Sequence, residues 1–331
     1  MQLDDLEYRA RQAMDSATYA FVADAAGRGL TARHNEDAFR RRTLRPRVLR
    51  DVATVDTGLE VLGRRVAAPV GVAPLPRMAA VHPTAERGLA EAAAEADVVF
   101  CAATNSTVEL EELVIDGATA WFQLYPHRDP GITGDLVARA VAAGYAAVVV
   151  TADRPVHGAK ASEATKRTDV AAYPNLARYG DVVAGRFDAS FTWQRLQDLI
   201  EACPIPVVVK GVLRGEDAHR AFDLGCGGVW VSNHGGRMLD QTIASLEALE
   251  DITVAVDGMG ELYLDGGVRR GIDPLIAAAL GATAVFVGRP LAYALAIGGR
   301  DGVAAALQQL RNELAHAIAL MGATRLADLD R

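Results

Sequence analysis

The sequence is poor in several features that define whole classes of protein. It has only three cysteines in 331 residues, and Cys101, Cys203 and Cys226 show neither paired spacing nor a Cys/His cluster, which argues against a disulfide framework or a zinc site. No stretch of about 20 uncharged apolar residues occurs, and the N-terminus lacks the apolar core of a signal peptide. The formal charge of −8 argues against a nucleic-acid-binding surface. These absences predict a soluble, cytoplasmic protein with no metal, nucleic-acid or membrane partner.

What the sequence does contain is a regular alternation of short apolar runs and Ala-rich amphipathic segments from about residue 67 onward. We expect buried strands at Ala68–Ala73, Val98–Ala102, Ala120–Leu124, Ala147–Thr151, Pro206–Lys210, Gly228–Ser232, Glu261–Asp265 and Ala284–Gly288. The expected helices include Pro83–Ala96, Gly134–Ala143, Trp193–Ala202, Arg214–Leu224 and Pro274–Leu280. Eight such units favour a closed, parallel (β/α)8 TIM barrel over an open doubly wound sheet. The open-sheet alternative is weakened further because no G-x-G-x-x-G motif opens a helix.

Length alone would suggest roughly two domains, but barrels often run to about 250 residues or more as one unit, so we expect residues 1–331 to form a single domain.

Two segments do not follow the alternation of strands and helices. Residues 1–66 begin with a helical pattern over Leu3–Phe39 and continue into a Pro-punctuated passage, which predicts a cap over one mouth of the barrel. Residues from about 155 to 190 lack periodicity, and an insert of this length after the fourth strand predicts a lid.

The stretch Val229–Asp240 (VWVSNHGGRMLD) places a histidine and an arginine three residues apart on a glycine-rich turn, just beyond a predicted strand. A lone histidine there could simply be a surface residue. However, polar residues recur at the carboxyl ends of the other strands, which meet at one mouth of a barrel, and so many buried polar groups are costly unless paired. In chain order these strand-end residues are Asn105, Gln123, Tyr125, Thr151, Asp153, Lys210, Ser232, His234, Arg237, Asp265 and Arg269.

The last two predicted strands are followed by Asp265–Gly271 (DGGVRRG) and Val287–Pro290 (VGRP). These loops combine glycine backbone amides with arginines, and barrels frequently hold a phosphate at this position. A phosphorylated cofactor is therefore expected.

The motifs at these positions carry a family resemblance. FQLY (Phe122–Tyr125), TADRP (Thr151–Pro155), VKG (Val209–Gly211), SNHGGRxLD (Ser232–Asp240), DGGVRRG and GRP are similar to those of the FMN-dependent 2-hydroxy-acid oxidases and dehydrogenases. This family includes glycolate oxidase, lactate oxidase and mandelate dehydrogenase. The resemblance runs from about Asp15 to the C-terminus.

The resemblance implies FMN as cofactor and a 2-hydroxy acid as substrate. It assigns His234 as the base that takes the hydroxyl proton, or the α-proton in a carbanion route, with flavin N5 as hydride acceptor. Asp153 would pair with the resulting imidazolium, which raises its basicity. Arg237 would clamp the substrate carboxylate with its planar fork of donors, and Tyr125 would hydrogen-bond a substrate oxygen. The implied cofactor contacts are Pro74, Gln123, Thr151, Lys210, Ser232, Asp265, Gly267, Arg269, Gly288 and Arg289.

Three positions depart from the family pattern. Lys160 stands where a second carboxylate-binding arginine is usual, Phe21 where a substrate-binding tyrosine is usual, and Asn105 where an aromatic pocket residue is usual. A small acid such as glycolate depends on many carboxylate contacts for its orientation. We therefore expect an aryl or larger, pathway-specific acid, as in the hydroxymandelate oxidases that also carry Phe at the first of these positions.

Other functions remain open at this point. The barrel could use FMN, or another phosphorylated ligand, without net oxidation, as an isomerase does. It could also be a non-catalytic flavin-binding relative. The motifs do not distinguish oxygen from another electron acceptor, and the resemblance implies a homotetramer.

Overall fold

The computed structural model describes residues 3–159, 173–180 and 187–329. Its centre is a closed barrel of eight parallel strands that follow one another in chain order. The barrel closes where the last strand pairs with the first, with Val285 opposite Val70 and Val287 opposite Val72. The TIM-barrel prediction is confirmed. The strands are β3 (Val70–Val72), β4 (Phe100–Ala103), β5 (Ala120–Leu124), β6 (Ala147–Thr151), β7 (Val207–Val212), β8 (Gly228–Val231), β9 (Glu261–Asp265) and β10 (Ala284–Val287).

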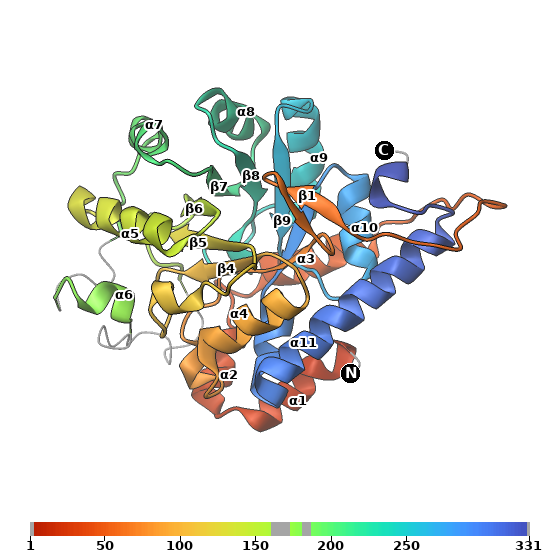
Figure 1. Cartoon of the computed structure of the whole chain (residues 1–331), viewed down its shortest axis with the longest axis horizontal. Coiled ribbons are helices and arrows are strands. Elements are labelled where there is room, and N and C mark those ends of the chain that lie inside the picture. The colour runs from red at the N-terminus through yellow and green to blue at the C-terminus, as the bar shows by residue number, and fades with distance from the viewer. Residues whose placement is uncertain (1–2, 160–172, 181–186, 330–331) are drawn as a thin grey trace.

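The helices surround this barrel (Figure 1). They are α4 (Ala85–Glu95), α5 (Pro130–Ala143), α7 (Trp193–Ala202), α8 (Gly215–Asp223), α9 (Ser245–Val256), α10 (Ile272–Ala279) and α11 (Arg289–Leu320), with the short α6 (Pro174–Ala177) in the insert after β6. The 32 residues of α11 are kinked at Gly298 and Gly299, where the backbone leaves helical geometry. Among the described residues, no helix is both long enough and apolar enough to cross a membrane.

The interior of the barrel is filled at its amino-terminal end by aromatic side chains. The rings of Trp230 and Phe286 are 3.9 Å apart between centroids, and those of Trp121 and Tyr263 are 5.0 Å apart. Glycine makes room for this packing, because a Cβ on Gly71 would lie 2.5 Å from the ring of Phe286. We call this group, Trp121, Trp230, Tyr263 and Phe286, the aromatic floor. Because the aromatic floor fills the interior below, a cavity in the barrel can lie only at its carboxyl end.

Residues 1–66 contribute to both ends of the barrel. Their helices are α1 (Leu6–Ala13), α2 (Ser16–Ala23) and α3 (Leu30–Arg40), and Phe21 of α2 lines the cavity at the carboxyl end. The hairpin of β1 (Leu59–Val61) and β2 (Arg64–Val66) instead packs Val61 and Val66 against the aromatic floor. The segment expected to cap one mouth is therefore divided between the two. Much of the segment expected as a lid, 160–172 and 181–186, lies outside the described residues.

Candidate active site

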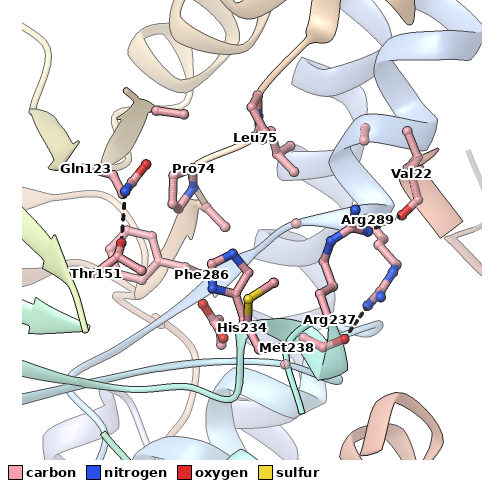
Figure 2. A pocket seen from close by; sticks show the side chains of 18 of the residues that line it. Val22, Pro74, Leu75, Gln123, Thr151, His234, Arg237, Met238, Phe286 and Arg289 are labelled. Carbon is pink, nitrogen blue, oxygen red and sulfur yellow. Dashed lines mark hydrogen bonds between the residues drawn. The ribbon is translucent and has the colours of Figure 1, made fainter. Parts of the chain in front are cut away.

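A cavity of about 650 Å³ opens at the carboxyl ends of the barrel strands, a size typical of cofactor and substrate sites. Figure 2 shows side chains from α2, the strand ends and the start of α11 around it. Most of the residues expected from the sequence line it: Phe21, Pro74, Asn105, Gln123, Tyr125, Thr151, Lys210, His234, Arg237, Asp265, Gly267, Arg269, Gly288 and Arg289. Asp153 and Ser232 lie behind lining residues and bond to them. Lys160 lies outside the described residues.

His234 and Asp153 form a hydrogen-bonded pair, although 81 positions separate them in the chain. The distance from His234 Nδ1 to Asp153 Oδ1 is 3.0 Å. The close approach of Asp153 depends on Gly211, because a Cβ there would lie 2.5 Å from the Cβ of Asp153. His234 Nε2 points away from the pair and lies 3.5 Å from the hydroxyl of Tyr125. The arrangement leaves Nε2 available to a molecule in the cavity.

Burial and the facing charge set the protonation of this pair. Burial lowers the pKa of His234, and the charge of Asp153 only partly opposes that effect. Burial would raise the pKa of Asp153, but His234 and Lys210 outweigh it and hold the pKa below its usual value. At neutral pH the pair is therefore a neutral imidazole, which donates Nδ1–H to an ionised carboxylate. A neutral Nε2 is a proton acceptor.

The backbone at His234 is in the left-handed region, with φ of +58°, and Gly235 and Gly236 follow at +63° and +74°. Helix α3 holds this strained turn in place. A Cβ on Gly236 would lie 2.6 Å from the backbone nitrogen of Ala32, so glycine is needed for the contact. The amide of Asn233 accepts from the backbone N–H of Gly236 and exchanges two hydrogen bonds with Asn35. The N-terminal helices therefore orient the histidine.

Arg237 is anchored by the C-terminal end of α2. Its guanidinium donates to the carbonyl oxygens of Phe21, Val22 and Asp24 at 2.9, 3.1 and 3.0 Å. Burial lowers the pKa of Arg237 to about 10, which still leaves it charged at neutral pH. Two of these bonds use Nη1 and one uses Nη2. The Nε–H and the second Nη2 hydrogen form the other edge of the guanidinium, which can bind a carboxylate side-on.

Lys210, Ser232 and Asp265 form a buried polar triad above the aromatic floor. Lys210 Nζ lies 2.6 Å from Ser232 Oγ and 2.8 Å from Asp265 Oδ2, and Ser232 Oγ donates to Asp265 at 2.6 Å. Burial would lower the pKa of Lys210, but Asp265 and Asp153 raise it above its usual value. The lysine therefore stays charged and presents a fixed cation to the cavity. Ser232 also accepts the backbone N–H of His234 at 3.0 Å, which connects the triad to the base.

The opposite part of the cavity has the features of an anion site. Gly266 and Gly267 adopt φ of +93° and +96°, and a Cβ on Gly267 would lie 2.2 Å from the carbonyl oxygen of Asn35. Arg289 donates to the carbonyl oxygens of Gly235 and Asp24, yet its buried Nε has no partner among the described residues. Arg269 is paired with Glu36 of α3 at 2.7 Å. An unsatisfied buried donor on a cation fits a bound phosphate.

These features together fit FMN. Gln123 donates to Thr151 at 2.9 Å (Figure 2). Thr151 lies opposite Lys210 on the paired strands, so amide, hydroxyl and ammonium groups gather where a flavin's polar edge would lie. The glycines and Arg289 provide for the phosphate at the other end. The residues present therefore meet the needs of both ends of the cofactor.

Two further cations line the cavity, and the sequence reasoning assigned no role to either. Arg154 directly follows Asp153 within the TADRP motif, and Arg77 lies three residues beyond Pro74. Each is a charged residue just past a strand end, which is the signal that could have identified it. Neither forms an ion pair with a carboxylate in the part of the chain that the structure describes.

Comparison with known proteins agrees with this geometry. The family profile described as "FMN-dependent dehydrogenase" matches residues 10–331. An "L-lactate oxidase" of Nostoc sp. is 38% identical, over 100% of this chain and 96% of that protein. A "4-hydroxymandelate oxidase" of Amycolatopsis orientalis is 39% identical, over 97% and 94%. A crystal structure of "Mandelate oxidase" superposes with a TM-score of 0.93 at 40% identity, covering 98% of this chain and 96% of that one. The chain therefore belongs to the FMN-dependent dehydrogenase family.

Proposed function

We propose that this protein uses FMN to oxidise a 2-hydroxy acid to the corresponding 2-oxo acid, with His234 as the base. The observation that carries the proposal is the His234–Asp153 pair, whose Nε2 lies beside Tyr125 in the cavity that Arg237 also lines. A base, a carboxylate clamp and a hydroxyl donor converge there, which is the set that a 2-hydroxy acid requires.

In this proposal the substrate carboxylate binds the side-on edge of Arg237, and Tyr125 donates a hydrogen bond to the substrate oxygen at C2. His234 Nε2 then accepts the hydroxyl proton as the C2–H bond breaks. Asp153 stabilises the imidazolium, because a carboxylate beside a developing cation favours the charged form. Bound FMN supplies the acceptor for the hydride equivalent.

Gln123, Thr151, Lys210 and Pro74 would hold the ring of FMN, while Asp265 would contact the ribityl chain. Lys210 is the cation suited to negative charge on the reduced ring, because its burial keeps the charge close and unscreened. Ser232 would act through Lys210 and Asp265, since its side chain is buried behind them. Arg289, Arg269 and the backbone of Gly267 and Gly288 would bind the phosphate.

We propose an aryl or larger acid rather than glycolate. Phe21 and Asn105 line the cavity in place of the usual tyrosine and aromatic residue, and Leu75 and Met238 add apolar surface. Relatives named for 4-hydroxymandelate and mandelate support an aryl group. Lys160 remains the proposed second contact to the carboxylate.

The remaining features of the enzyme are also proposals. Oxygen is the proposed electron acceptor, because the relatives are named as oxidases. The proposed homotetramer rests on the family resemblance, and the proposed single domain over residues 1–331 rests on the size that such barrels reach as one unit. A cytoplasmic location is supported by the low cysteine content and the free thiols of Cys101, Cys203 and Cys226.

The test is anaerobic reduction of the purified, FMN-loaded protein. Mandelate and a series of aliphatic 2-hydroxy acids should bleach the flavin absorbance, and readmitted air should restore it. A protein that binds FMN but is bleached by none of these acids would overturn the oxidation and favour a non-redox or non-catalytic role. A protein that cannot be loaded with FMN would overturn the cofactor assignment.

A further inference from the structure

We propose that the substrate carries a second carboxylate, distant from the reacting carbon, and that Arg77 and Arg154 bind it. The inference rests on the proposed oxidation and specifies the class of 2-hydroxy acid. It follows from the charges that line the cavity.

The cavity has more positive charge than the expected ligands account for. Among the described residues, six cationic side chains and one carboxylate, that of Asp265, line it. Asp265 pairs with Lys210, and Arg269 pairs with Glu36. The four that remain are Arg77, Arg154, Arg237 and Arg289, and none has a carboxylate partner within ion-pair distance among residues 3–159, 173–180 and 187–329.

Two of the four have an expected anion. Arg289, with its unsatisfied buried Nε, fits the FMN phosphate, and Arg237 fits the carboxylate next to the reacting carbon. Arg77 and Arg154 have no anion assigned to them. Cations in a partly enclosed, apolar-walled cavity lose hydration, and an anion restores that free energy.

Arg154 lies against two adjacent aromatic rings. Its guanidinium carbon lies 4.7 Å from the ring centroids of both Tyr125 and Phe187, and one of its Nη atoms lies 3.0 Å from His157 Nδ1. Phe187 is itself fixed by a backbone bridge to His127. The two rings are themselves 4.5 Å apart between centroids, so both lie on one side of the guanidinium and leave its other side open to an anion. The buried Nε of Arg154 has no partner among the described residues, so a donor is still unsatisfied.

Arg77 approaches the same region from the loop after β3. Its guanidinium carbon lies 4.5 Å from the ring centroid of Phe21, and its backbone is left-handed with φ of +64°. Burial raises the pKa of the Tyr173 phenol, and the positive charges of Arg77 and Arg154 partly oppose that rise. Arg77, Arg154 and Tyr173 all line the same cavity.

The guanidinium of Arg154 lies one aromatic ring away from the base, His234. Arg154 stacks on the ring of Tyr125, whose hydroxyl is 3.5 Å from His234 Nε2. A carboxylate bound by Arg154 would thus be separated from C2 by several bonds. Dicarboxylic 2-hydroxy acids meet that requirement, and so does an aryl acid with a carboxylate on its ring.

The experiment compares matched substrates that differ only in the second carboxylate: malate with 2-hydroxybutyrate, 2-hydroxyglutarate with 2-hydroxypentanoate, and 4-carboxymandelate with 4-methylmandelate. We expect at least one diacid to exceed its partner in kcat/KM by tenfold or more. In Arg154→Gln and Arg77→Gln this ratio should fall by roughly tenfold to a hundredfold, as expected for loss of a charge-assisted hydrogen bond. Arg128→Gln is the control, because Arg128 is exposed on the loop after β5 and does not line the cavity.

A binding measurement gives a second readout that needs no turnover. Calorimetry with FMN-loaded protein should show tighter binding of 2-oxoglutarate than of 2-oxopentanoate, and Arg154→Gln should reduce the difference. Equal affinities, an absence of diacid preference, or a preference that survives both arginine substitutions would overturn the second carboxylate site. If mandelate bleaches the flavin in these cases, the oxidation itself stands. If no acid of either kind bleaches it, the proposed oxidation fails, and the substrate assignment fails with it.

Discussion

The two ends of this barrel are built from the same strands and serve different purposes. On β5 and β9, and at the end of β8, an aromatic residue of the floor is followed two positions later by a polar residue of the site: Trp121 by Gln123, Tyr263 by Asp265, and Trp230 by Ser232. Residues two apart on a strand point to the same side, so both members of each pair face the barrel interior. On these three strands the aromatic residue therefore supplies packing, and the polar residue two positions later supplies chemistry.

The difference shows how a buried polar site can exist in an apolar core. The aromatic floor closes the cavity from below, because its rings pack against one another and Phe286 lines the cavity. Above it, Lys210 is paired with Asp265, and His234 is paired with Asp153. Substitutions at the two ends should therefore have separable effects.

The largest effect should come from His234→Ala. Loss of a positioned general base should slow anaerobic flavin reduction by about 10²–10⁴-fold. FMN binding should persist, because Lys210 and Arg289 are untouched. Stopped-flow absorbance measures the rate, and bound flavin per protein is the control. An unimpaired reduction rate would remove His234 as the base.

The matching change at the floor is Trp121→Ala. Trp121 is fully buried and contacts Trp230, Tyr263 and Phe286, so its truncation should lower the free energy of unfolding by about 3–5 kcal/mol. Chemical denaturation of the FMN-free protein measures this loss. The fraction of the Trp121→Ala variant that remains folded should still reduce its flavin at a rate within a few-fold of that of the wild type. A loss of activity as large as that of His234→Ala would contradict the separation of the two ends.

Arg237→Met should have an intermediate effect. The variant keeps the volume of the side chain but removes the clamp, so kcat/KM for 2-hydroxy acids should fall by roughly 100-fold, mainly through KM. Steady-state kinetics with the best substrate test this. Turnover unaffected by the substitution would favour a reaction that needs no carboxylate clamp, such as isomerisation.

The smallest effect concerns pH. Because burial lowers the pKa of His234, the base is neutral above that pKa, and the reduction rate should be level through neutral pH. Below the pKa, protonation blocks Nε2, and the rate should fall by up to tenfold per pH unit. Asp153 raises the pKa of His234, so Asp153→Asn should move this acid limb to lower pH while slowing the reaction. Movement of the limb to higher pH would contradict the assignment.

Much of the fold was predictable because its signals are local. Parallel strands that are buried on both faces appear as continuous apolar runs, and each of the eight runs became a barrel strand. The β1–β2 hairpin was not predicted, since strands of three residues leave no periodicity to detect. Residues 1–66 were expected at one mouth, and sequence patterns do not reveal which end of a barrel a segment will cover.

The site was predictable as a set of residues and not as an arrangement. The strand-end rule brought Gln123, Thr151, Lys210, His234 and Arg237 to one cavity. It did not distinguish Ser232, which lies behind the cavity wall, from its neighbours that line it. It also missed Arg77 and Arg154, whose surroundings come from α2 and from the insert after β6.

The sequence by itself determined the barrel, the family and the polar residues at the strand ends, because strand burial and motif spacing are properties of short segments. Only the tertiary structure decided what each charge faces. Arg237 meets the carbonyl groups of α2, more than 200 positions away, and Arg154 lies against adjacent rings from two different loops. Such contacts depend on left-handed turns and on closure of the barrel, and no local propensity encodes them.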